Sequence, residues 1–92
     1  MSLALPLTHH ARQRMDGRRI SAEAVDAVLA YGRAVHVRGA CIHALGRREV
    51  AQAAREGVDL QAHRNLQVVC GADGTVLTVY RNADFRSLRR SA

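Results

Sequence analysis

The chain has 92 residues, which is the size of one domain. It contains eight acidic and 14 basic residues, and all the basic residues are arginine. The net charge of +6 favours an anionic partner, because a planar guanidinium pairs with phosphate through two hydrogen bonds. Hydrophobic residues make up 48% of the chain, which excludes a largely disordered protein. No apolar run approaches the roughly 20 residues of a membrane span, and the first seven residues are too short for a signal peptide. We therefore expect a cytoplasmic protein with no membrane partner.

Two short helices are predicted near the start of the chain. Thr8 is a suitable N-cap for a helix over 9–15, and Gly17 ends that helix. Ser21 is the N-cap of a second helix, which closes at Gly32. The apolar face of this second helix consists of three residues at helical spacing: Val25, Val28 and Leu29.

Two β-hairpins are predicted farther along the chain. Residues 34–38 and 41–45 are strand-like, and Gly39-Ala40 between them is a two-residue loop of the kind that joins hairpin strands. Residues 65–70 and 75–80 flank a second turn, which contains two glycines and an aspartate.

A third helix is predicted over 47–56, between the hairpins, whereas 60–64 fits neither pattern. The predicted fold class is α+β, with two N-terminal helices, an antiparallel sheet of about four strands and one further helix between the two hairpins. We expect a single domain over residues 1–92, with a frayed basic tail over 82–92.

Each predicted hairpin has one apolar face and one mixed face, because side chains alternate along a strand. We expect both apolar faces to pack against the helices; they carry Val35, Val37, Ile42 and Ala44 in the first hairpin, and Leu66, Val68, Leu77 and Val79 in the second. The opposite side of the sheet, open to solvent or a ligand, would carry His36, Arg38, Cys41, His43, Gln67, Val69, Val76, Thr78 and Tyr80.

The predicted loop length places His36 directly opposite His43. Such a pair is either a solvated cross-strand pair or a general acid–base pair, because histidine titrates near neutral pH. With Cys41 it could also bind a metal ion, but the spacing matches no zinc signature, and we expect neither a metal nor another cofactor. Cys41 and Cys70 are expected to be free thiols that pack as small apolar residues.

Two segments resemble the family called domain of unknown function 4258. Residues 8–15 fit the pattern T-x-H-A-x-x-R-M and are followed by Arg18-Arg19-Ile20-Ser21, which opens the second helix. The closing strand of the family, V-[IVL]-T-V-Y, is similar to residues 76–80. In the order of its elements the family is similar to RelE/ParE-like toxins, which share a wider fold with barnase-type ribonucleases. This resemblance implies four candidate site residues: His10, Arg14, Arg18 and Thr78.

The basic charge and the resemblance together indicate two classes of function. In the first, the chain is a metal-independent endoribonuclease of toxin type, whose catalytic set is His10, Arg14, Arg18 and Thr78, with His36 and His43 as reserves for the second proton transfer. In the second, the chain is a non-catalytic module that binds RNA or an acidic antitoxin-like protein, or a ParE-like toxin that acts by protein contact. The expected nucleic-acid contacts are Arg12, Arg14, Arg18, Arg19, Arg38 and Tyr80; a solvated basic surface is the alternative.

Overall fold

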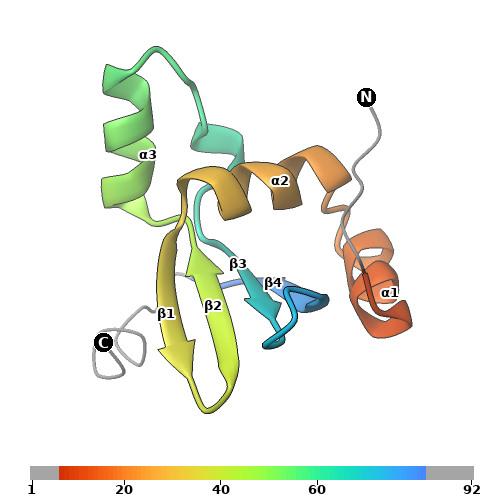
Figure 1. Ribbon diagram of the computed structural model, residues 1–92. Coiled ribbons are helices and arrows are strands. Elements are labelled where there is room, and N and C mark those ends of the chain that lie inside the picture. Colours follow the sequence, from red (N-terminus) through yellow and green to blue (C-terminus); the bar gives the residue numbers. More distant parts are fainter. Residues whose placement is uncertain (1–6, 83–92) are drawn as a thin grey trace.

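The computed structural model describes residues 7–82, and within this range the sheet has four strands and is accompanied by three α-helices (Figure 1). In chain order the elements are α1 (His9–Gly17), α2 (Ala22–Tyr31), β1 (Arg33–Val37), β2 (Ala40–Ala44), α3 (Arg47–Arg55), a short 3₁₀ helix η1 (Gln61–His63), β3 (Leu66–Cys70) and β4 (Val76–Arg81). All neighbouring strands are antiparallel, in the order β1-β2-β3-β4. The predicted α+β fold class is confirmed. Most of the predicted basic tail, residues 83–92, lies outside the described residues.

The helices begin and end where the sequence predicts. The hydroxyl oxygens of Thr8 and Ser21 each accept a hydrogen bond, 3.0 Å long, from the main-chain amide three residues farther on. Glycine is required at Gly32, after α2, because a Cβ there would collide with the carbonyl oxygen of Val28.

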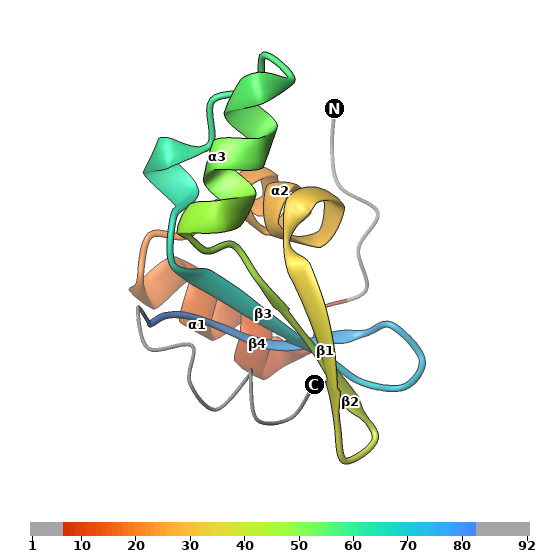
Figure 2. The ribbon, with the colours of Figure 1, turned by 90° about the vertical axis from the view of Figure 1, so that its left-hand side faces the viewer.

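The core lies between the helices and one side of the sheet (Figure 2). α2 packs over β3 and β2, whereas α1 packs against β4. The largest fully buried side chains are aliphatic: Val25, Val28, Leu45, Leu66, Val68, Val76 and Val79. Of the residues expected in the core, Val25, Val28, Val68 and Val79 are buried, whereas Leu29, Val37 and Ile42 are half-buried.

The two hairpins turn their apolar faces to opposite sides of the sheet, so the prediction that both pack against the helices is wrong. Ile42 of β2 pairs with Val69 of β3, which belongs to the mixed face of the second hairpin. The apolar face of the first hairpin therefore forms a separate small cluster away from the helical core, made of Val35, Val37, Ile42 and Ala44. The pairing of β2 with β3 is set across the long connection through α3, and no local turn pattern specifies it.

The same register places His36, Cys41 and His43 on the helix side of the sheet. The expectation of one polar face shared by both hairpins is thus also wrong. Only the part contributed by the second hairpin remains on the side away from the helical core, namely Gln67, Val69, Thr78 and Tyr80.

A β-bulge at Leu77 explains a further difference. Val69 pairs with Thr78 but Cys70 pairs with Val76, so the pairing skips Leu77. As a result Val76 is fully buried in the core, whereas Leu77 is 37% exposed. The predicted burial of Leu77, and the predicted place of Val76 on the mixed face, both assumed an uninterrupted ladder.

The turn of the first hairpin lies one residue earlier than predicted. Arg38 and Gly39 have positive φ angles of 47° and 78°, which is the backbone that a two-residue type I′ turn requires. The pairing of the strands shifts accordingly, so His36 lies opposite Cys41 and not opposite His43.

Candidate nucleic-acid interface

Three basic side chains form a line along one flank of α1. His10, Arg14 and Arg18 are spaced four residues apart, so successive members project from nearly the same side of the helix; Arg18 is its C-cap residue. All three are exposed, while Ala11 and Met15 face the core from neighbouring positions. We call His10, Arg14 and Arg18 the α1 row.

His10 and Arg14 are in direct contact within this row. Nε of Arg14 donates a hydrogen bond to Nε2 of His10 over 3.3 Å. The accepting nitrogen must carry a lone pair, so in this contact the ring proton is on Nδ1. The contact therefore places a proton-accepting ring nitrogen beside a permanent positive charge.

Arg18 attaches α1 to the sheet. Its Nη1 donates a hydrogen bond to the carbonyl oxygen of Val79 in β4 over 3.2 Å. At the other end of the helix, the hydroxyl of Thr8 donates to the carbonyl oxygen of Leu77 over 3.1 Å. These bonds satisfy carbonyl groups on the outer edge of β4. One of the five N–H donors of Arg18 thus has a structural role, and within residues 7–82 the other four have no hydrogen-bond acceptor.

Arg12 and Arg19 are not members of the α1 row. Each residue of a helix turns by about 100°, so Arg12 lies on the opposite flank of α1, one turn before Asp16. Arg19 follows the helix in a left-handed backbone conformation with a φ of 52°. Both side chains are exposed. Of the arginines predicted to contact nucleic acid, only Arg14 and Arg18 therefore share one flank of α1.

Thr78 and Tyr80 lie on β4, on the side of the sheet away from the helical core, opposite Val69 and Gln67. Both are half-buried, and burial raises the pKa of the Tyr80 phenol. Gln67 is 2% exposed, and its side-chain amide donates a hydrogen bond to the carbonyl oxygen of Asn82 over 3.0 Å. The structure thus groups the predicted polar residues of the second hairpin.

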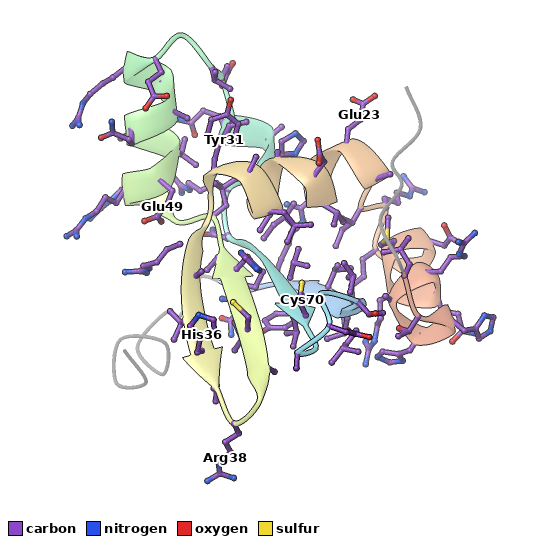
Figure 3. All side chains as sticks on the ribbon, in the orientation of Figure 1. Glu23, Tyr31, His36, Arg38, Glu49 and Cys70 are labelled. Carbon is purple, nitrogen blue, oxygen red and sulfur yellow. The ribbon has the colours of Figure 1, made fainter. Side chains whose placement is uncertain are left out.

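His36 and His43 are diagonal neighbours on the first hairpin, on the same side as Cys41. Nε2 of His43 lies 3.6 Å from Sγ of Cys41. Burial of His43, and the positive charge that His36 would carry nearby, lower the pKa of His43. Figure 3 shows His36 on β1, the strand at the edge of the sheet opposite to β4. The two reserve histidines are therefore not brought to the α1 row.

Cys41 and Cys70, which the sequence presents as unrelated thiols, are direct partners across β2 and β3. Both are free, and burial together with the neighbouring Cys41 raises the pKa of the Cys70 thiol. Sequence reasoning missed this pair because the partners come from different predicted hairpins, whose relative register has no local signal.

Arg38, another predicted nucleic-acid contact, is exposed at the tip of the first hairpin (Figure 3).

Within residues 7–82, no three His, Cys, Asp or Glu side chains are grouped so that they could hold a metal ion. In that same part of the chain, no helix combines the length and the apolar character needed to cross a membrane.

The α1 row and β4 belong to the two segments that carry the family resemblance. The family described as domain of unknown function DUF4258 matches residues 7–81. The chain belongs to this family. No curated protein and no solved structure matches the chain. The DUF4258 match includes every helix and strand described above, so the α1 row is part of the DUF4258 domain itself.

Proposed function

We propose that this DUF4258 domain binds RNA through the α1 row. The observation that carries the proposal is the exposure of His10, Arg14 and Arg18 in one line on a single flank of a helix. At a rise of about 1.5 Å per residue the row extends roughly 12 Å, which is long enough to reach more than one phosphate of a strand. Each guanidinium offers a planar fork to phosphate oxygens.

The distribution of charge supports an anionic ligand at this flank. The only acidic residue of α1 is Asp16, and it projects from the opposite flank. A net charge of +6 raises the local concentration of a polyanion around the whole domain. The resemblance in element order to RelE/ParE-like toxins, which we infer from the sequence, would point in the same direction, but a fold alone does not determine a function. The proposal therefore depends on the row.

RNA cleavage is a second candidate, and the contact between His10 and Arg14 favours it. Cleavage without a metal needs a base for the 2′-hydroxyl proton and a positive charge for the phosphorane. Arg14 would turn from His10 to the phosphate, which frees Nε2 of His10 to take the proton. Arg18 would hold the phosphate from the next turn, whereas Thr78 lies on the side of the sheet away from the helical core and has no part in this scheme. The α1 row contains no second histidine that could protonate the leaving oxygen. Binding is therefore the first proposal and cleavage the second.

Fluorescence anisotropy with a labelled single-stranded RNA, in excess chelator, tests the binding proposal. Affinity should fall steeply as salt rises, because each neutralised phosphate releases counterions. Arg14→Gln should weaken binding and reduce the slope of log affinity against log salt by about one. Arg48→Gln, which removes the same charge from an exposed position on α3, is the matched control and should keep the slope. Equal losses of affinity in both variants would contradict binding at the α1 row. No RNA binding by the wild type would contradict the proposal and favour an acidic protein partner.

Electrophoresis of the RNA after the same incubations tests cleavage. A cleaving domain should give products without metal, and His10→Ala should lose them while Arg48→Gln keeps them. Intact RNA that stays bound to the wild type would exclude the second candidate and leave the first in place.

A further inference from the structure

Cys41 and Cys70 are directly opposite each other on β2 and β3, the two central strands of the sheet. Figure 3 labels Cys70 on β3. Directly opposite Cα atoms of an antiparallel pair are about 4.5–5.5 Å apart, within the roughly 4.4–6.8 Å that a disulfide spans. Opposite residues also project from the same side of the sheet. A bond between the two sulfurs therefore needs no change in strand register.

The two thiols have different surroundings. Cys70 is 5% exposed and packs in the core, whereas Cys41 is half-buried. Only Cys41 has an imidazole at hydrogen-bonding distance, with its Sγ 3.6 Å from Nε2 of His43. Burial lowers the pKa of His43, which favours the neutral ring that can accept a hydrogen bond from the Cys41 thiol, and burial raises the pKa of Cys70, which disfavours its reactive thiolate. An oxidant from solvent therefore reacts at Cys41 first.

We propose that Cys41 and Cys70 form a redox-sensitive modification site, which a peroxide converts to an intramolecular disulfide between β2 and β3. The site lies on different residues from the α1 row, so it does not depend on RNA binding. The disulfide would close a loop that contains α3 and η1, and would hold the two central strands together.

The oxidation proceeds in two balanced steps. Cys41 gives its proton to His43, and its thiolate attacks one oxygen of hydrogen peroxide. The O–O bond breaks, and the departing hydroxide takes that proton to form water, which leaves Cys41 as a sulfenic acid. The sulfur of Cys70 then attacks the sulfur of Cys41, the S–O bond breaks, and a second water leaves with the Cys70 proton. The two thiols lose two electrons, and the peroxide gains them.

Intact-mass measurement of the reduced full chain after treatment with hydrogen peroxide tests the site. The chain should lose the mass of two hydrogen atoms, give a Cys41–Cys70 cross-link in a peptide map, and regain its mass with dithiothreitol. Cys70→Ser should stop at a Cys41 sulfenic acid that dimedone traps, whereas Cys41→Ser should leave Cys70 unmodified at the same dose. Addition of oxygen to both thiols without a cross-link, or cross-links only between chains, would overturn the proposal.

His43 is a positioning residue in this scheme, and His43→Gln tests it. Near His43 on this side of the sheet, the titratable groups are His36 on β1, Cys41 on β2 and Cys70 on β3. The variant should oxidise several-fold more slowly, and its rate should lose the dependence on pH that titration of His43 causes. His63→Gln, in η1 and outside the sheet, should keep both the rate and the pH profile. Identical behaviour of the two variants would remove His43 from the mechanism.

Discussion

Arg18, at the end of α1, donates a hydrogen bond to the carbonyl oxygen of Val79, 61 residues farther along the chain. Thr8 makes the corresponding contact at the start of the helix, to the carbonyl oxygen of Leu77. A helix of nine residues is marginal by itself in water. These two contacts, together with the buried face of α1, fix the helix along the outer edge of β4. The same attachment fixes the direction in which the α1 row projects.

Replacing Thr8 tests this attachment. Thr8→Ala should lower the free energy of unfolding by about 1–2 kcal/mol, because it removes the N-cap and the bond to the carbonyl oxygen of Leu77 together. Thr8→Ser keeps a hydroxyl at the same position and should lose less than half as much. Urea denaturation measures both values, and equal losses in the two variants would show that the hydroxyl does not hold the helix.

A matched pair of leucines tests the β-bulge. Leu66 is 1% exposed and Leu77 is 37% exposed, although both belong to the second hairpin. Leu66→Ala should cost about 2–5 kcal/mol of unfolding free energy, the usual range for a buried leucine. Leu77→Ala should cost less than about 1 kcal/mol, as is usual for a surface position. Equal losses of unfolding free energy at Leu77 and Leu66 would show that β4 pairs with β3 without a bulge.

The local features of the fold could be predicted from the sequence because each depends on a few adjacent residues. Thr8 and Ser21 begin their helices through bonds to amides three residues away, and both hairpins form at glycine-containing turns. The relative orientation of the hairpins could not be predicted in this way. The pairing of Ile42 with Val69 joins strands that are separated by α3 and η1, and a displacement of one residue there exchanges the two sides of the sheet.

Some features of the candidate site could likewise be predicted from the sequence, and others could not. The spacing of His10 and Arg14 is visible in the sequence, because residues four apart share one side of a helix. By contrast, the bond from Arg18 to β4 and the pairing of Cys41 with Cys70 join distant segments, and neither has a local signal. The predicted pairing of His36 with His43 is wrong because the hairpin turn lies one residue earlier than predicted, which places His36 opposite Cys41.

The lowered pKa of His43 predicts a pH dependence of stability. The folded chain binds fewer protons at His43 than the unfolded chain does, so its contribution is fully present above the unfolded pKa of about 6.5. It is lost as pH falls from there through the lower folded pKa. Urea midpoints measured between neutral and mildly acidic pH should therefore fall less steeply for His43→Gln than for the wild type. Parallel curves for the two proteins would show that His43 titrates as a free histidine.

Chemical-shift mapping by NMR tests the central claim, RNA binding at the α1 row, most directly. The isotope-labelled chain is titrated with a single-stranded RNA at low salt, and the amide shifts are followed residue by residue. The largest changes should fall on α1 around His10 and Arg14 and on the adjoining edge of β4, and they should reverse when salt is added. Changes concentrated on the first hairpin around Arg38, with the amides of α1 unmoved, would contradict the assignment of this surface.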